Sequence, residues 1–285
     1  MGQGYQDRDW DIVDYQLWHL EGIPRPFRGP RPLNDGNNGI VCVGAAQTFG
    51  CYTDRPFPLL VQEAMGMSVL NMGVAGAGHL FFTSRHRFLE RINRAKLAVI
   101  QVMSGRSESN SLFASDGGEM LTKRSDQAKI GAAPAYRELL KHSSPEVVKN
   151  IIHETRHNWI RHYLELFQMI EIPKILFWFS ERKEDFERNY SNVHAFFGQF
   201  PQLVRSDWID EITPYVDEYV SCVSSRGMPQ QLINRFTGKK GFINKRSDLG
   251  GGKKLTNDYY PSPEMHIDAA QVLIPVCRRM LEQKP

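Results

Sequence analysis

Two stretches of this sequence place polar side chains directly after a predicted buried strand. The apolar run 40–43 leads into residues 44–48 (GAAQT), and the apolar run 95–103 leads into residues 104–110. Ligands bind at the carboxyl ends of the strands in open α/β sheets. We therefore expect a binding site where these two strands end.

The side chains in these stretches that could contact a ligand are Gln47, Thr48, Ser104, Arg106, Ser107, Glu108 and Asn110. The guanidinium fork of Arg106 suits a carboxylate, sulfate or phosphate, and its structural alternative is a surface salt bridge. Glu108 is a candidate general base. Gln47 and Thr48 either contact a ligand or cap the turn after the strand. For residues 104–110 we favour ligand contact, because a polar run after a buried strand lies at the binding edge.

A different chemistry is suggested by residues 153–157 (HETRH), which match the H-E-x-x-H pattern of zinc proteases. In that interpretation His153 and His157 would bind zinc, and Glu154 would polarise a zinc-bound water. The third ligand would be His162 or Glu181. Against zinc, Arg156 places a cation beside the metal, and the apolar stripe of this predicted helix turns both motif histidines toward solvent. We therefore predict no metal and no cofactor, and keep a zinc-dependent hydrolase on this helix as an alternative.

The elements that must position these residues alternate along the chain. Strands are predicted at 40–43, 68–72, 95–103, 175–179 and near 219–223, and helices at 58–65, 81–93, 144–170 and 263–283. This order favours a three-layer α/β/α sandwich with a mainly parallel sheet. We expect residues 1–38 to form an N-terminal arm and 39–285 the α/β domain. A loop-rich and helical insertion is expected at about 111–170, with 116–133 as loop.

Composition and charge narrow the function classes. The chain is 41% hydrophobic and 24% charged, with a net charge of +3. This is typical of a soluble globular protein and gives no reason to predict nucleic-acid binding. No apolar run reaches the ~20 residues that span a bilayer, and the acidic amino terminus does not resemble a signal peptide. The four cysteines show no paired spacing, so we expect a cytoplasmic protein. The oligomeric state stays open.

Four phrases of the sequence resemble the four conserved blocks of the SGNH/GDSL hydrolases, in the same order. They are VCVGAAQTFG (41–50), VLNMGVAGAG (69–78), AVIQVMSGRSESN (98–110) and YYPSPEMHIDAAQVL (259–273). The resemblance covers about residues 40–110 and 257–281 and implies a flavodoxin-like sandwich. It also implies that the backbone amide of Gly76 contributes to an oxyanion hole. GAAQTFG, NMGVAGAG and YPSPEMH resemble more closely an uncharacterised bacterial family with the same core.

The sequence departs from the SGNH pattern at the catalytic positions. Aligned on Gly44 and Gly50, the nucleophilic serine is replaced by Ala46 and the preceding aspartate by Ala45. An alanine methyl cannot attack a carbonyl group, so serine acyl-enzyme chemistry is excluded at that position. In the last block, alignment puts Tyr260 on the catalytic histidine and Asn257 on its aspartate. His266 then corresponds to a later histidine.

The expected site keeps backbone and side-chain groups around the positions of the missing triad. Backbone N–H groups of Ala46 and Gly76 could form an anion-binding nest, with Tyr260 nearby and with His266 or Glu108 as base. We expect a divergent SGNH-like protein that acts on or binds a polar ligand, such as a saccharide or an acyl or sulfuryl ester. It would be a hydrolase or group transferase with non-standard catalytic residues. The alternative is a non-catalytic binding or scaffold protein that lost the triad.

Overall fold

The centre of the molecule is a five-stranded parallel sheet in the order β10-β9-β5-β3-β4. The computed structural model describes residues 4–244 and 251–282. The sheet strands are β3 (Ile40–Gly44), β4 (Val69–Gly73), β5 (Leu97–Gln101), β9 (Lys174–Ser180) and β10 (Glu218–Val223). The first strand of this sheet, β3, lies between the second, β4, and the third, β5. The connections therefore run in opposite directions from β3, which creates a switch point at the carboxyl ends of β3 and β5.

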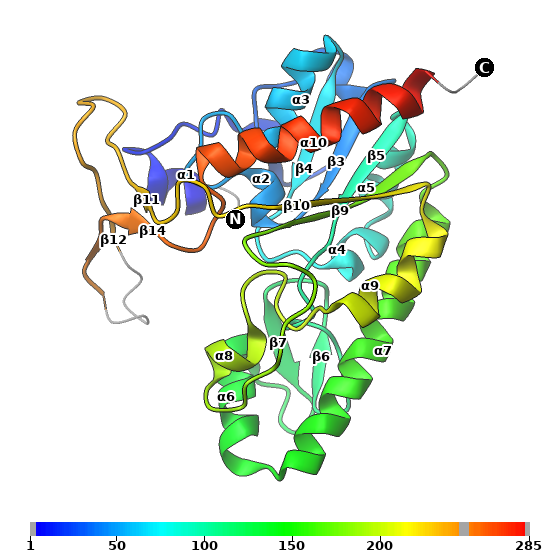
Figure 1. The fold of residues 1–285 in the computed structure, drawn as a ribbon, viewed down its shortest axis with the longest axis vertical. Coiled ribbons are helices and arrows are strands. Elements are labelled where there is room, and N and C mark those ends of the chain that lie inside the picture. The colour runs from blue at the N-terminus through cyan, green and yellow to red at the C-terminus, as the bar shows by residue number, and fades with distance from the viewer. Residues whose placement is uncertain (1–3, 245–250, 283–285) are drawn as a thin grey trace.

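Helices cover both faces of this sheet (Figure 1). On one face lie α3 (Phe57–Met65) and α10 (Pro263–Glu282), packed on alternate strand residues that include Cys42 and Val99. On the other face lie α4 (His79–Thr83), α5 (His86–Asn93), α7 (Pro145–Met169) and α9 (Ser206–Ile212), packed on the intervening residues. The predicted three-layer α/β/α sandwich is confirmed. All residues of β3, β4 and β5 are buried, as expected of strands covered on both faces.

Two segments of the chain differ from the structure predicted for them. Residues 116–133, predicted as loop, contain two strands, β7 (Met120–Lys123) and β8 (Lys129–Gly131), which form an antiparallel sheet with β6 (Phe113–Ser115). Among the residues of β7 only Leu121 is buried, so the sequence shows too little alternation to reveal the strand. The single helix predicted at 81–93 is two helices, because the chain leaves helical geometry at Arg85 (φ −128°, ψ 88°).

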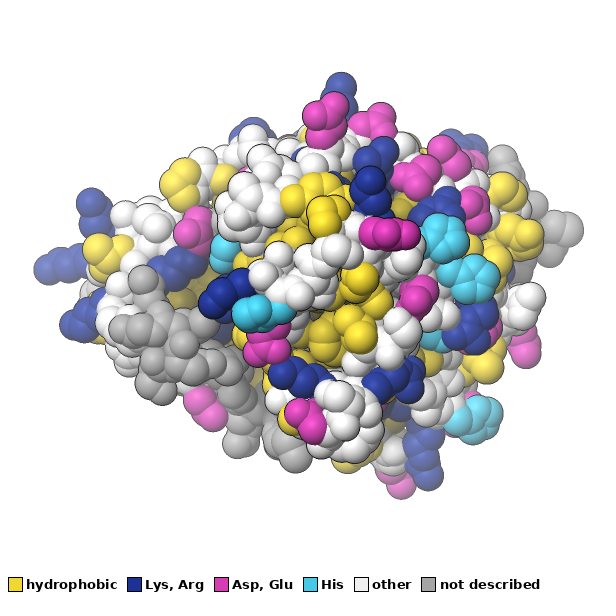
Figure 2. All heavy atoms as spheres, turned by 90° about the horizontal axis from the view of Figure 1, so that it is seen from below, with side chains coloured by type: hydrophobic (Ala, Val, Ile, Leu, Met, Phe, Trp, Pro, Cys, Tyr) yellow, Lys and Arg dark blue, Asp and Glu magenta, His cyan; other side chains and the backbone are white. Residues whose placement is uncertain are grey.

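The remaining elements surround the sandwich. They are α1 (Gly4–Asp9), β1 (Trp18–His19), β2 (Pro26–Phe27), η1 (Leu33–Gly36), α2 (Ala46–Phe49), α6 (Ala132–His142), α8 (Val193–Phe197), η2 (Thr213–Tyr215), β11 (Gln230–Gln231), β12 (Ile243–Asn244), β13 (Lys253–Lys254) and β14 (Thr256–Asn257). In Figure 1, β6, β7, α6 and α8 lie below the sheet, beside the first turns of α7. Of the segment 111–170, predicted as an insertion, β6, β7 and α6 lie in this region, whereas α7 also packs on the central sheet. None of the described helices combines the length and apolar composition needed to cross a bilayer. Figure 2 shows the lower face, where acidic and basic side chains are interspersed around apolar ones.

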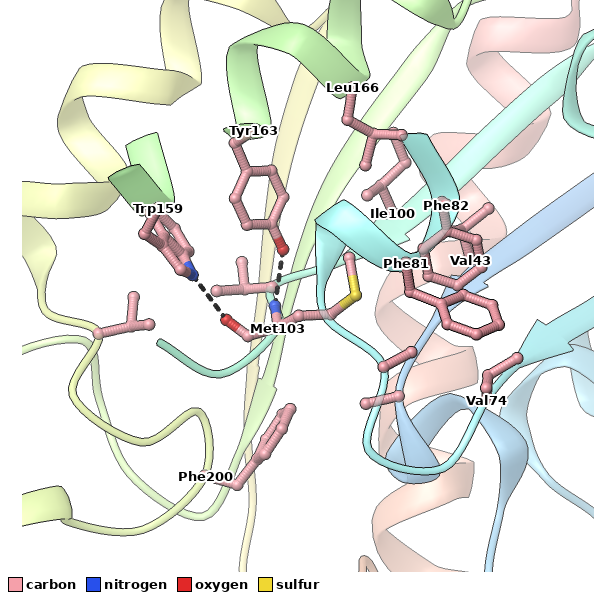
Figure 3. Close-up of a cluster of buried hydrophobic side chains, with 14 of the residues drawn as sticks. Val43, Val74, Phe81, Phe82, Ile100, Met103, Trp159, Tyr163, Leu166 and Phe200 are labelled. Carbon is pink, nitrogen blue, oxygen red and sulfur yellow. Dashed lines mark hydrogen bonds between the residues drawn. The ribbon is translucent and has the colours of Figure 1, made fainter. Parts of the chain in front are cut away.

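The end of β5 is fixed by two aromatic side chains of α7 (Figure 3). The indole of Trp159 donates to the carbonyl oxygen of Met103 at 3.1 Å. The hydroxyl of Tyr163 accepts from the Met103 N–H at 2.7 Å and donates to the Gln101 carbonyl oxygen at 2.9 Å. Because these groups are buried, leaving them unpaired would be unfavourable. These bonds therefore fix the backbone at the start of the loop after β5, and thereby help to position residues 104–110.

The first prediction concerns the contact between α2 and β4. A Cβ on Gly73 would lie 2.1 Å from the backbone nitrogen of Phe49, so Gly73→Ala forces the two backbones apart. We expect the free energy of unfolding, measured with urea, to fall by about 1–3 kcal/mol. Gly131→Ala is the matched control, since its added Cβ meets only Pro134 Cδ at 3.5 Å. Equal stability of the two variants would contradict this account of the packing.

Candidate functional site

A cavity of about 60 Å³ opens at the carboxyl ends of the central strands. Its walls come from residues 45–47 after β3, 76–80 after β4, and 104 and 106–108 after β5, with Tyr5, Tyr259 and Tyr260 from segments far away in the sequence. The cavity lies where the connections from β3 diverge, as the sheet topology predicts. Three separate loops therefore converge on one small volume.

One wall of the cavity is formed by backbone at the start of α2. Ala45 N–H donates to Gln101 Oε1 at 2.9 Å, and the Thr48 hydroxyl donates to the same oxygen at 2.8 Å. These bonds fix the turn that places Ala46 against the cavity. Within the described part of the chain, the Ala46 N–H has no hydrogen-bond acceptor. An unpaired N–H at the start of a helical turn suits an anionic or carbonyl oxygen.

The second backbone contribution comes from Gly76. Its φ of +70° is unfavourable for residues with a side chain, and an added Cβ would lie 2.7 Å from the Cβ of Glu119. Glycine is therefore required at this position. Like Ala46, Gly76 lines the cavity, and its N–H has no acceptor among the residues described here. The two residues could jointly bind one oxygen of a ligand.

Beside these backbone groups lies a buried cluster of Glu108, His79 and His162. His79 Nε2 is 2.8 Å from Glu108 Oε2, and His162 Nδ1 is 3.1 Å from Glu108 Oε1. The three residues expose 4%, 1% and 6% of their surfaces, respectively. They come from the loop after β5, the first residue of α4, and α7. Glu108 and His79 line the cavity.

The hydrogen bonds assign the protons in this cluster. Arg161 lies 2.9 Å from His162 Nε2, and a guanidinium can only donate. His162 therefore accepts at Nε2, carries its proton on Nδ1 and donates it to Glu108. His79 donates to the carboxylate from Nε2, and its buried Nδ1 has no hydrogen-bond partner among the residues that the structure describes. A ring oriented by a carboxylate with its other nitrogen free is the arrangement of a general base.

The charges agree with this assignment. Burial alone raises the pKa of Glu108, but the hydrogen bonds from His162 and His79 outweigh burial and lower the pKa to about 2. For His79, burial lowers the pKa below its usual value despite the opposing effect of Glu108. Near neutral pH the cluster therefore contains an ionised carboxylate and an uncharged His79 imidazole.

The same three side chains are the group in the described chain that could hold a metal ion, since their ligand atoms lie within 4.8 Å of one another. Two features favour the hydrogen-bonded cluster instead. The two histidines contact different oxygens of the carboxylate, as expected if each ring donates one hydrogen bond to it. A metal on His162 Nδ1 would move the proton of this ring to Nε2, where Arg161 also donates. The motif 153–157 forms no metal-ligating group in the described residues.

Most residues predicted for the site line the cavity. They are Ala46, Gln47, Gly76, Ser104, Arg106, Ser107, Glu108 and Tyr260. Arg106 forms no ion pair with a described carboxylate, so the structure supplies no salt-bridge partner for it. Tyr260 contacts the Tyr5 hydroxyl at 3.1 Å. Because burial raises its pKa, Tyr260 is a neutral phenol that can donate a hydrogen bond.

Three predicted residues lie elsewhere. His266, proposed as a base, packs between Phe57 and Phe179 and accepts from the Phe57 N–H at 3.1 Å. Burial lowers its pKa to about 3, and it does not line the cavity, so the structure gives it a role in the core. Thr48 is bound to Gln101. The amide oxygen of Asn110 accepts from two backbone N–H groups at the start of β6. Thr48 and Asn110 stabilise turns.

The residues of the H-E-x-x-H motif on α7 do not have the positions that zinc binding would require. His153 and His157 are exposed, as the apolar stripe predicted. Glu154 accepts from the Ser111 N–H, and Arg156 pairs with carboxylates of α9. His162, considered only as a ligand for that motif, instead faces Glu108.

Sequence reasoning missed His79 as a site residue and did not combine His162 with Glu108. His79 follows the glycine-rich turn after β4, so the rule that polar residues at strand ends form sites would have found it. His162 lies within the buried stripe of α7, between Trp159 and Leu166. A histidine in an otherwise apolar stripe was the available signal, because such a ring needs a buried partner.

Comparison with known protein families places the chain in one of them. A three-layer sandwich with a polar cavity at the switch point of its sheet defines an α/β protein of the open, mainly parallel type. The chain belongs to the family described as "Domain of unknown function (DUF6473)", whose model matches residues 4–116 and 137–281. No curated protein matches the chain.

Several solved structures are similar in backbone arrangement. One is phospholipase A1 from Streptomyces albidoflavus NA297, with 9% identity, 86% of this chain and 99% of that chain covered, and a TM-score of 0.46. A second is a carbohydrate esterase family 2 enzyme from Corynascus thermopiles (Myceliophthora fergusii), with 10% identity, coverage of 89% and 68%, and a TM-score of 0.44. A third is a putative lipolytic protein of the G-D-S-L family from Desulfitobacterium hafniense DCB-2, with 12% identity, coverage of 84% and 99%, and a TM-score of 0.41.

The second prediction concerns the buried charge of Glu108. Glu108→Gln removes the charged acceptor of two imidazole N–H groups, so we expect the free energy of unfolding at pH 7 to fall by about 2 kcal/mol. The folded-state pKa of about 2 lies below the ordinary value of 4.5. The contribution of Glu108 is therefore complete above the ordinary value and is lost as pH falls toward the folded value.

Urea unfolding at pH 7, 5, 4 and 3 measures this difference between the wild type and Glu108→Gln. We expect the difference to shrink from pH 5 to pH 3. Glu63→Gln, which changes an exposed carboxylate, is the control and should have a small effect at every pH. A stability difference for Glu108→Gln that is the same at pH 7 and pH 3 would mean that Glu108 is not ionised in the folded protein.

Proposed function

We propose that this protein hydrolyses an ester of a polar ligand in the strand-end cavity, using His79 oriented by Glu108 as general base. One observation carries the proposal. A buried carboxylate holds an uncharged imidazole beside the cavity that Ala46 and Gly76 also line. In the described part of the chain, the N–H groups of Ala46 and Gly76 have no acceptor. A base and an oxyanion-binding wall are the two parts that ester hydrolysis requires.

The chemistry assigns the attack to water. Because Ala46 carries no nucleophile, a water molecule attacks the ester carbonyl carbon while the free Nδ1 of His79 accepts its proton. The carbonyl oxygen becomes negatively charged, and the N–H groups of Ala46 and Gly76 bind it. The tetrahedral intermediate then breaks its bond to the alcohol oxygen, which receives the proton from His79. The products are a carboxylic acid and an alcohol, and Glu108 stays ionised and holds the imidazolium.

The dimensions and charge of the cavity indicate the substrate class. A volume of about 60 Å³ accommodates a small acyl group such as acetyl and a water molecule. Arg106, Tyr259 and Tyr260 line the cavity, and their polar groups suit hydroxyl or anionic groups of the alcohol part. An acetylated saccharide carries both features.

A second candidate function is binding without turnover. Ala46 at the position of the nucleophile favours it, and so does the burial of His79 Nδ1, since water must reach this nitrogen for catalysis. In this alternative the same backbone groups and Arg106 hold a polar ligand that leaves unchanged.

The third prediction tests hydrolysis directly. Acetate release from a panel of acetylated mono- and oligosaccharides is measured for the wild type and for His79→Gln, which keeps a donor toward Glu108 but removes the base. We expect release by the wild type and a loss of about 10²–10⁴-fold in the variant. The matched control is His153→Ala, which removes an exposed histidine of α7 and should leave the rate unchanged.

The outcomes separate the alternatives. Release that persists in His79→Gln would contradict the assignment of the base. Loss of release on treatment with a chelator, restored by added zinc, would assign the cluster of Glu108, His79 and His162 to metal chemistry. Ligand binding in calorimetry without any acetate release would support the non-catalytic alternative.

A further inference from the structure

A second and larger cavity, of about 690 Å³, lies between the N-terminal arm and the helices α4 and α5. It is lined by residues 22–25 of the arm, by Phe81 and by residues 85–88, and it shares no lining residue with the strand-end cavity. Ile23, Phe81 and Phe88 are buried core residues whose edges form its apolar part. This volume is suited to a small organic molecule.

Three arginines line the same cavity: Arg25, Arg85 and Arg87. The guanidinium carbons of Arg25 and Arg85 lie 5.5 and 3.8 Å from the ring centroid of Phe81. Arg85 Nη1 donates to the Phe81 carbonyl oxygen at 2.8 Å and to the Ser84 hydroxyl at 3.0 Å, so its position is fixed. The side chain of Arg87 reaches the backbone of Gly22 in the arm. The charges thus converge from two sides of the cavity.

None of the three guanidinium groups forms an ion pair with a carboxylate in the described part of the chain. Among the described residues, the carboxylate contact made by a residue lining this cavity is that of His86 Nε2 with Glu90 Oε1 at 3.2 Å. Burial lowers the pKa of Arg25, and the nearby charge of Arg85 lowers it further. The face of Phe81 attracts cations, but it brings no negative charge. Three like charges gathered without a counter-ion create a local field that favours an anion.

We propose that this second cavity binds a small amphiphilic anion, meaning a phosphate or carboxylate group attached to a short apolar chain. The anionic group would be held by Arg85 together with Arg25 or Arg87, since guanidinium groups bind such oxygens in pairs. The apolar chain would lie against Ile23, Phe81 and Phe88. This proposal is independent of the ester hydrolysis proposed above, because the two cavities have no lining residue in common.

Isothermal titration calorimetry with three matched probes tests the proposal on the full chain. The probes are hexyl phosphate, which has both parts of the ligand, inorganic phosphate, which has only the anion, and hexan-1-ol, which has only the apolar chain. We expect hexyl phosphate to bind once per chain and at least tenfold more tightly than either of the others. Absence of hexyl phosphate binding, or equal affinity for inorganic phosphate, would overturn the proposal.

Variants locate the binding. We expect Arg85→Gln and, separately, Arg87→Gln to weaken hexyl phosphate binding at least tenfold. Arg94→Gln removes the same charge from the exposed end of α5, outside the cavity, and should bind as the wild type does. Thermal unfolding without ligand checks that each variant is folded. If one of the two cavity variants does not fold, the other still tests the proposal. Equal weakening by Arg94→Gln, or unchanged binding in both cavity variants, would show that the anion does not bind here.

Discussion

The buried carboxylate of Glu108 is the interaction on which the site depends. A charge with 4% exposure is tolerated only when hydrogen-bond donors surround it, and here those donors are the imidazoles of His79 and His162. Satisfying one carboxylate thereby joins α4, the loop after β5 and α7. On the same helix as His162, Trp159 and Tyr163 hold the backbone of Met103. Both ends of the loop that forms the cavity are therefore fixed by α7.

The sheet explains why the cavity lies at this place. The connections from β3 run in opposite directions, which leaves a space above the ends of β3 and β5 that loops fill only partly. Small residues at Ala46 and Gly76 bring backbone N–H groups to that space, and the residues that follow β5 bring charge. Helix α4 contributes to both cavities, since His79 belongs to the first and Phe81 to the second. A ligand in either cavity therefore contacts the same short helix.

Features of the fold that depend on local sequence pattern and on the order of strands and helices could be predicted from the sequence. The five strands of the parallel sheet, the long helix α7 and the position of the cavity all follow from apolar runs and the residues at their ends. The short strands β6–β8 were missed because their residues are only partly buried. His266 is one of the two bases that the sequence suggests, because nothing near it in sequence reveals its bond to Phe57, 209 residues away. The cluster of Glu108 was missed for the same reason, since His162 lies 54 residues from it. Partners of buried polar groups depend on tertiary packing, which periodicity does not encode.

The most direct test of this account is nitrogen NMR of the imidazole rings in wild-type protein labelled with ¹⁵N-histidine. The His79→Gln spectrum assigns the His79 signals. At pH 7 the account predicts a neutral His79 that carries its proton on Nε2, with a bare Nδ1, and a His162 that carries its proton on Nδ1. A doubly protonated His79, or signals of both rings that shift when a chelator is added, would contradict the account. The first result would remove the base, and the second would make the cluster a metal site.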